Sequence, residues 1–237
     1  MFQNPKALDR IERAIPRCRR CPELRAYCAG IGAKKRRAYE DWTYWAKPVP
    51  GFGDRRARIV IVGLAPAAHG ANRTGRMFTG DRSGDFLYAA LHRCGLANQP
   101  TSTDRRDGLD LDGVYITAAL RCAPPANKPT SVQLANCRPY LTEELAMLRP
   151  AVTLCLGAVA WKAALEALES AGEALPKPKP KFAHGARHRV GFTVLLGCYH
   201  VSQQNTFTGR LTEAMLDAVL RRAAKVAGVR GSSLVRP

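Results

Sequence analysis

Cysteine pairs are the residues whose spacing first suggests chemistry. Cys18 and Cys21 are separated by two residues, and Cys122 and Cys137 lie far downstream with fourteen residues between them. A C-x₂-C pair alone is compatible with zinc, redox or iron–sulfur chemistry. Two pairs brought together in the fold would form a Cys₄ site for zinc or for a [4Fe–4S] cluster, and Cys28 is a rival fourth ligand.

Two polar, glycine-rich segments carry the other candidate chemistry. One runs from Gly63 to Asp81, and the other begins at His200 and continues to Arg210. A histidine can donate or accept a proton near neutral pH, and an aspartate can act as a general base or stabilise a cation. His200 and Asp81 are therefore candidates for acid–base chemistry. Asp81 also suits a helix start, although another residue of that turn could cap the helix and leave Asp81 free.

The elements that must position these residues alternate between strands and helices. Four short apolar runs, rich in β-branched residues, are typical of strands buried on both faces: 58–64, 114–120, 152–157 and 192–197. Helical periodicity marks five segments: 5–15, 85–94, 139–148, 158–170 and 208–226. This alternation predicts an α/β fold with a parallel sheet that is covered by helices on both faces.

Both polar segments follow predicted strands, at the edge where open α/β sheets bind their ligands. We expect one domain over residues 1–228 and a flexible polar tail over residues 229–237. Residues 33–50 are basic and aromatic and are expected to form a surface loop or a short helix. Its Lys34 to Arg37 run and the Lys177 to Lys181 run would supply a general positive field.

The net charge narrows the class of partner. The chain has 237 residues, with 37 Lys and Arg against 19 Asp and Glu, which gives +18. Such an excess predicts a polyanionic partner, namely DNA, RNA or an anionic membrane, and argues against a small-metabolite enzyme of neutral surface. No apolar run is long enough to span a membrane, and residues 1–6 do not resemble a secretory signal. We therefore expect a cytoplasmic protein with reduced thiols.

Four motifs give the sequence a family resemblance over roughly residues 18–220. They are GLAPAAHG, RMFTGD, RCAPPANKP and HVSQQNTFTGRL, in this order. Together they resemble the uracil-DNA glycosylase superfamily, and in detail family 5, the type b iron–sulfur enzymes. The resemblance implies a three-layer αβα sandwich around a four-stranded parallel sheet. It also implies a [4Fe–4S] cluster held by Cys18, Cys21, Cys122 and Cys137, which makes Cys28 a spare thiol.

The resemblance further implies hydrolysis of the N-glycosidic bond of uracil in DNA, the first step of base excision repair. The target base would leave the stack and enter a pocket. Phe78 would stack on it, and the backbone N–H groups of Leu64 and Ala65, in the turn set by Gly63, would contact a base carbonyl. His200 would donate to the leaving base. Asp81 and Asn127 would act on the attacking water or the sugar cation.

Two departures from the superfamily pattern concern the base pocket: the turn after Gly63 has Leu64 and Ala65 where most members carry a polar residue, often Asp or Glu, and the second is at Ala118. Ala118 stands where many members place an asparagine that reads the uracil edge. An apolar wall rejects alternative bases poorly, so we expect a broad pocket. The family resemblance agrees, because type b enzymes also remove hypoxanthine, ethenocytosine and 5-hydroxymethyluracil.

The remaining candidate residues would contact DNA outside the base pocket. A loop resembling the family's minor-groove intercalation loop would probe the gap left by the flipped base. Arginines of the first polar segment would contact phosphates. The predicted DNA-contacting residues are Arg73, Arg76, Gln203, Gln204, Phe207 and Arg210.

Two other classes of protein compete with the glycosylase hypothesis. A non-catalytic nucleic-acid-binding module with a structural Cys₄ zinc site fits the charge and the cysteines equally well, but it leaves His200 and Asp81 unexplained. An iron–sulfur redox enzyme is the third hypothesis, and no G-x-G-x-x-G dinucleotide motif supports it. For the glycosylase, the family resemblance implies a monomer.

Overall fold

A six-stranded sheet is the central element of the computed structural model, which describes residues 5–230, with side chains from residue 7. The strand order is β1-β3-β2-β4-β6-β5. The four inner strands are parallel, and each edge strand is antiparallel to its neighbour. The strands are β1 (Phe52–Gly53), β2 (Ile59–Gly63), β3 (Val114–Ala118), β4 (Val152–Leu156), β5 (Arg187–Val190) and β6 (Thr193–Cys198).

The inner strands β2, β3, β4 and β6 are the four that the apolar runs predict, and all four are buried throughout. The expected four-stranded parallel sheet is therefore the centre of a larger mixed sheet. Both edge strands escaped prediction for a physical reason. β1 has two residues, and β5 (Arg-His-Arg-Val) is largely exposed, so neither shows an apolar run.

Eight α-helices are described, and a side-chain cap marks the start of three of them, α4, α5 and α8. The segment expected to begin at Pro139 begins at Ser131, because Thr130 and Gln133 form a capping box before it. The last helix begins after Thr212, whose hydroxyl accepts from the Met215 amide. The helices are α1 (Pro5–Ala14), α2 (Pro22–Lys34), α3 (Ala71–Thr74), α4 (Arg82–Arg93), α5 (Ser131–Leu148), α6 (Ala158–Ser170), α7 (Gln203–Phe207) and α8 (Glu213–Ala227).

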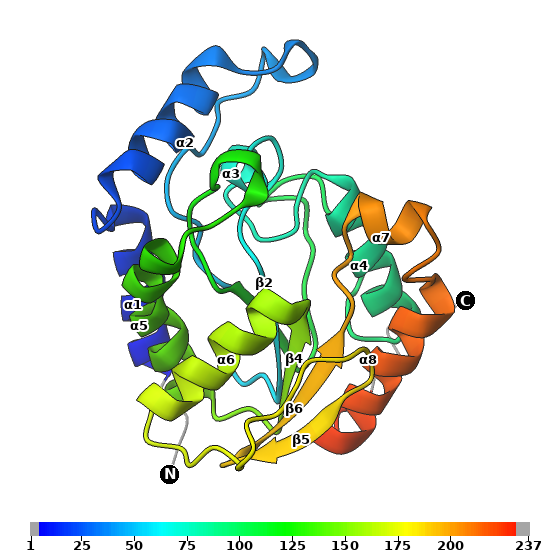
Figure 1. Cartoon of the computed structure of the whole chain (residues 1–237). Helices are drawn as coiled ribbons and strands as arrows, with labels where there is room; N and C mark the ends of the chain where they lie inside the picture. Colours follow the sequence, from blue (N-terminus) through cyan, green and yellow to red (C-terminus); the bar gives the residue numbers. More distant parts are fainter. Residues whose placement is uncertain (1–4, 231–237) are drawn as a thin grey trace.

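The helices form two layers around the sheet, as Figure 1 shows. Alternating side chains of each strand face opposite layers: Ile59 and Ile61 pack with α4 and α8, whereas Val60 and Val62 pack with α1, α5 and α6. The predicted αβα sandwich is thus confirmed. Packing also continues past residue 228, because Val229 lies against the core on the α4 and α8 side of the sheet. Residues 231–237 of the expected tail lie outside the described residues.

Helix α2 was not expected, and it lies at one end of the molecule together with α3 (Figure 1). Its sequence contains Gly30 and Gly32 and has little amphipathic periodicity, so the sequence pattern does not predict a helix there. Within the described residues, none of the helices is both long enough and apolar enough to cross a membrane.

A buried charge cluster joins the sheet to α5. Glu144 is completely buried, and it accepts hydrogen bonds from Arg121, Thr117 and Tyr115. Arg121 is itself only 1% exposed. Since a buried charge without a partner is very unfavourable, each of these two residues requires the other.

We predict that Glu144→Gln destabilises the protein by about 3–5 kcal/mol, because it leaves the Arg121 guanidinium buried without its counter-charge. Urea unfolding measures the change. The control is Glu166→Gln, which breaks a partly exposed ion pair with Arg138 and is expected to cost no more than about 1 kcal/mol. Equal losses in the two variants would contradict this account of the cluster.

Candidate active site

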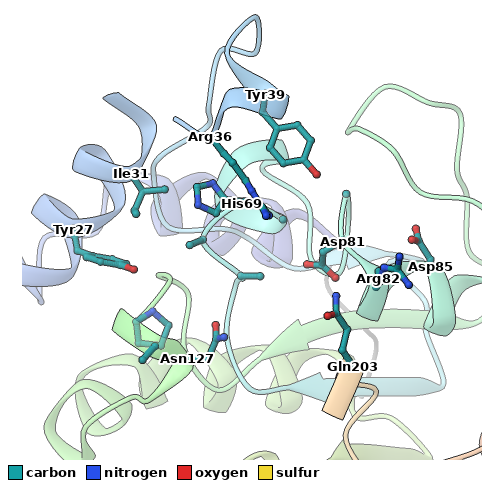
Figure 2. Close-up of a pocket in the computed structure, with 16 residues that line it drawn as sticks. Tyr27, Ile31, Arg36, Tyr39, His69, Asp81, Arg82, Asp85, Asn127 and Gln203 are labelled. Atoms are coloured by element: carbon teal, nitrogen blue, oxygen red, sulfur yellow. The ribbon is translucent and has the colours of Figure 1, made fainter. Parts of the chain in front are cut away.

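A cleft of about 600 Å³ is lined by the loops that follow β2, β3 and β6 (Figure 2). Three of the predicted residues line it, namely Asp81, Asn127 and Gln203. They come from the start of α4, the loop after β3 and the start of α7. The fold therefore brings together residues that are far apart in the sequence.

The turn after β2 presents two backbone donors. The carbonyl groups of Gly63 and Leu64 accept from the amides of Ala119 and Leu120, at 2.9 and 3.0 Å. The N–H groups of Leu64 and Ala65, in contrast, have no acceptor within the described part of the chain. Unpaired amides at a strand end are suited to bind the carbonyl oxygens of a ligand.

Phe78 lies against the end of β2 because position 63 has no side chain. A Cβ atom at Gly63 would come within 2.6 Å of the Phe78 ring. Phe78 also has a φ of +52°, a conformation that bulky residues rarely adopt and that clusters at functional sites. Its ring centroid is 6.3 Å from that of His200. The two predicted residues thus form one aromatic pair at the end of β2, and neither is among the residues that line the cleft.

Asp81 is itself the N-cap of α4, so of the two alternatives left open by the sequence the helix start is the one observed. Its Oδ1 accepts from the Gly84 amide at 3.0 Å. Its Oδ2 lies over Gly70, where a Cβ atom would come within 2.0 Å of it. Burial raises the pKa of the Asp81 carboxyl, and the backbone amides of Gly84 and Ser83 oppose that shift.

His200 and Asn127 are held by their backbones, so their side chains are left available. The carbonyl of His200 accepts from Asn205 at 2.8 Å, whereas no hydrogen bond to its ring nitrogens is found within the described chain. Desolvation lowers the pKa of His200 to about 4, so the imidazole is neutral at neutral pH. Asn127 has a φ of +56° and lines the cleft (Figure 2).

Arg73 does not fit the expected role of a phosphate contact. It is only 4% exposed, and its guanidinium lies between the rings of Tyr39 and Trp42, at 3.9 and 4.0 Å from their centroids. Its Nε and Nη2 donate to the carbonyl groups of His69 and Gly80, both at 2.8 Å. Arg73 therefore ties loop segments together.

Arg76 is also buried, at 4% exposure, and does not fit the expected phosphate contact either. It makes a bidentate ion pair with Asp107 at 2.8 and 2.6 Å and donates to Ser102. This ion pair and backbone hydrogen bonds hold the pKa of the Asp107 carboxyl at about 2 despite its desolvation. A guanidinium so paired is not available to DNA.

The segment expected to probe the DNA gap includes the short helix α7. Gln203, Gln204, Phe207 and Arg210 are all exposed, and Phe207 is 68% exposed. The Arg82 guanidinium lies over the Phe207 ring at 5.5 Å from its centroid. An exposed phenylalanine next to a cleft is the kind of apolar wedge that enters a base step.

The four predicted cysteine ligands line one cavity behind the loop after β3. Cys18 and Cys21 come from the segment before α2, Cys122 from that loop and Cys137 from α5. Burial raises the pKa of the Cys137 thiol to about 11, and Cys18 and Cys21 contribute to the shift. The cavity is thus a common meeting point of the two cysteine pairs.

One residue that lines the same cavity carries unpaired polar atoms. Arg121 lines it, and the Nε and Nη1 atoms of this buried residue have no hydrogen-bond partner in the described structure. Asn136 donates to Cys21 Sγ at 3.5 Å. Cys28 is buried nearby and donates to the Ala123 carbonyl at 3.6 Å, but it does not line the cavity. Across the described residues, no three His, Cys, Asp or Glu side chains converge tightly enough for a single metal ion.

Comparison with known proteins gives a consistent result. Residues 50–224 match the family model described as the uracil DNA glycosylase superfamily. The chain belongs to that superfamily. It is 50% identical to a Type-5 uracil-DNA glycosylase of Mycobacterium leprae, over 94% of this chain and 97% of that protein. Type-5 uracil-DNA glycosylases of Mycobacterium bovis and Thermus thermophilus are 53% and 50% identical, over 90% of this chain and 79% and 94% of theirs.

Ala118 is a position where the sequence departs from the superfamily pattern. It is buried at the end of β3, directly opposite Gly63 in the parallel register. Its methyl group therefore offers no hydrogen bond beside the turn that carries Leu64 and Ala65. The position fits the expected apolar wall, and the consequence for base selection stays a prediction.

Sequence reasoning missed several residues of this glycosylase-superfamily cleft. Tyr27 and Ile31 of α2 line it, as do Arg36, Tyr39 and His69 (Figure 2). The basic and aromatic composition of 33–50 marked that segment, but only as a general positive surface. Because α2 was not predicted, nothing in the sequence placed this segment beside the loop after β2.

We predict that His200 remains neutral until the pH falls to about 4, because charging a desolvated imidazole is unfavourable. NMR titration measures this, with His200→Gln identifying the resonance. Urea-unfolded protein should show the ordinary value of about 6.5. The unfolded chain then binds the extra proton first, so this histidine lowers stability as the pH falls from about 6.5 towards 4. An ordinary pKa in the folded protein would contradict the prediction.

Proposed function

We propose that this protein is a DNA repair glycosylase that hydrolyses the N-glycosidic bond of uracil in DNA. The observation that carries the proposal is that a buried carboxylate, a neutral histidine and unpaired backbone donors all follow the carboxyl ends of parallel strands, at one edge of the sheet. Such a reaction needs a negatively charged group near the sugar and hydrogen-bond donors near the base. The reaction develops positive charge on the sugar and negative charge on the departing base.

The base would be recognised after it has left the helix. Unstacking costs a few kcal/mol, which stacking on Phe78 and hydrogen bonds from Leu64 and Ala65 would offset. The amides are preorganised by the hydrogen bonds that Ala119 and Leu120 donate to the same turn. Preorganised donors stabilise developing negative charge without reorganisation.

His200 would stabilise the base as the bond breaks. The C1′–N bond electrons move onto the base, and a neutral imidazole N–H can donate to the carbonyl oxygen where that charge collects. A cationic imidazolium would be more acidic, but its desolvation makes it unavailable at neutral pH. Exposed Phe207 would enter the gap left in the duplex.

Asp81 and Asn127 would act on the other side of the bond. Water adds its oxygen to C1′ and loses one proton, and the departing base gains one, so the products are an abasic sugar and the free base. The Asp81 carboxylate would accept a hydrogen bond from this water and stabilise the sugar cation. Asn127, on the opposite wall of the cleft, would orient the water.

The pocket would accept bases other than uracil. Ala118 supplies no amide to read the uracil edge, and rejection of an alternative base requires a polar group left unpaired by it. We therefore include hypoxanthine, ethenocytosine and 5-hydroxymethyluracil among its substrates. The enzyme is proposed to act as a monomer.

We predict that Asp81→Asn lowers single-turnover uracil release by roughly 10²–10⁴-fold, because the general base or cation stabiliser is lost. His200→Ala should lose about 10²–10³-fold. The matched control is Asp85→Asn, a cleft-lining carboxylate one helical turn away, which should stay within about threefold of wild type. No release by wild-type protein would contradict the proposed function, whereas full activity of Asp81→Asn would remove only the role of that carboxylate.

We further propose that Cys18, Cys21, Cys122 and Cys137 hold a [4Fe–4S] cluster. Four cysteine side chains that line one cavity are the donor set that such clusters use. The unpaired Nε and Nη1 of Arg121 suit an anionic sulfur-rich group, which would satisfy both. When bound, the cluster would add folding free energy by linking distant segments.

We predict that purified wild-type protein is brown and contains about four iron and four inorganic sulfide per chain. Changing any of the four cysteines to alanine should lower both contents. Cys28→Ala and Cys94→Ala are controls that should retain them, because neither side chain lines the cavity. A colourless protein containing one zinc per chain would contradict the cluster and support the Cys₄ zinc alternative.

A further inference from the structure

The burial of Arg73 and Arg76 leaves open which residues meet the DNA backbone at the cleft. Arg36 and His69 also line the cleft, although the sequence did not predict them there, and Figure 2 shows both on the side of the cleft away from Asn127. Arg36 is exposed, and its guanidinium forms no ion pair within the described residues. It is thus a cation at the cleft without an acidic partner.

Tyr44 fixes the donor character of His69. Its hydroxyl lies 3.0 Å from His69 Nδ1, and its ring is buried. The hydroxyl hydrogen finds no other acceptor in the described structure, and an unsatisfied buried hydroxyl is unfavourable. We therefore assign Tyr44 as the donor and Nδ1 as the acceptor. The neutral ring then has its hydrogen on Nε2 and is a directed donor.

The surroundings of His69 favour that neutral form and attract an anion. Desolvation lowers the pKa of His69, and the nearby positive charges of Arg36 and Arg73 lower it further. The positive field that disfavours an imidazolium is favourable for a negatively charged ligand. The cleft carboxylates, Asp81 and Asp85, lie on the α4 side (Figure 2).

The segment that carries Arg36 is held in place before any ligand binds. The Trp45 and Ala46 amides donate to the carbonyl groups of Arg73 and Asn72, both at 2.9 Å. The Tyr39 and Trp42 rings enclose the Arg73 guanidinium. These contacts join residues 39–46 to the loop that contains His69. Little ordering is then required on binding.

We infer that Arg36 and His69 form a binding site for one phosphodiester of the DNA strand that carries the flipped nucleotide. The inference rests on the proposed glycosylase function, and it names a contact that this function needs. A phosphodiester accepts hydrogen bonds from both an arginine and an imidazole N–H, and charge-assisted bonds are the stronger ones. Held here, the phosphate would anchor the sugar beside Asp81.

Binding to a duplex with a stable tetrahydrofuran abasic site tests the inference without requiring base release. Fluorescence anisotropy should give a Kd about tenfold higher for Arg36→Ala and about fivefold higher for His69→Phe. The slope of log Kd against log salt should fall by about one for Arg36→Ala. The control, Arg37→Ala, removes an exposed neighbouring arginine that belongs to the general positive field but does not line the cleft, so Kd should rise by no more than about threefold.

Neutral methylphosphonate linkages, introduced one at a time around the abasic site, identify the phosphate. At one position the substitution should weaken wild-type binding by about tenfold and leave binding of Arg36→Ala unchanged. Equal effects on both proteins at every position would overturn the inference, as would equal affinities of Arg36→Ala and Arg37→Ala. If wild-type protein releases uracil, such results refute the phosphate site alone. A wild-type protein that releases no uracil refutes the proposed function instead.

Discussion

Two positions without side chains, Gly63 and Gly70, are the constraint on which the cleft depends. Phe78 lies in the space at Gly63, and the Asp81 carboxylate lies in the space at Gly70, where a Cβ atom would come within 2.6 and 2.0 Å of them. The aromatic surface and the carboxylate therefore reach the strand end because backbone alone is opposite them. Arg73 holds the two loop segments in this arrangement by bonding to a carbonyl group of each.

The burial of Arg73 is one of three cases that change how the net charge should be interpreted. A net charge of +18 indicates a polyanionic partner, but Arg73, Arg76 and Arg121 are buried, so their charges do not lie on the protein surface. They are buried against rings, carbonyl groups and carboxylates, although Arg73 Nη1 and the Nε and Nη1 atoms of Arg121 have no hydrogen-bond partner in the described structure. The excess of positive charge that can contact DNA is consequently smaller than the composition suggests, and exposed residues supply it.

The parts of the fold that depend on local pattern could be predicted from the sequence. Buried strands such as 59–63 and the αβα layering follow from apolar runs, and Asp81, Asn127 and Gln203 meet because strand ends share one edge. The exposed β5 and the weakly amphipathic α2 lack such a pattern. The burial of Arg73 could not be predicted, because it depends on rings that approach from residues 39–42.

The cysteine cavity and the cleft are parts of one arrangement. Helix α2 starts directly after Cys21, carries Tyr27 and Ile31 to the cleft, and is followed by Arg36. On the opposite wall, Asn127 follows Cys122 after a short, proline-rich stretch. A group that held Cys21 and Cys122 together would therefore set the distance between the α2 wall and the Asn127 wall of the cleft, even without touching DNA. Arg121 extends the same linkage to the core through Glu144, so the position of Asn127 depends on charges buried behind it.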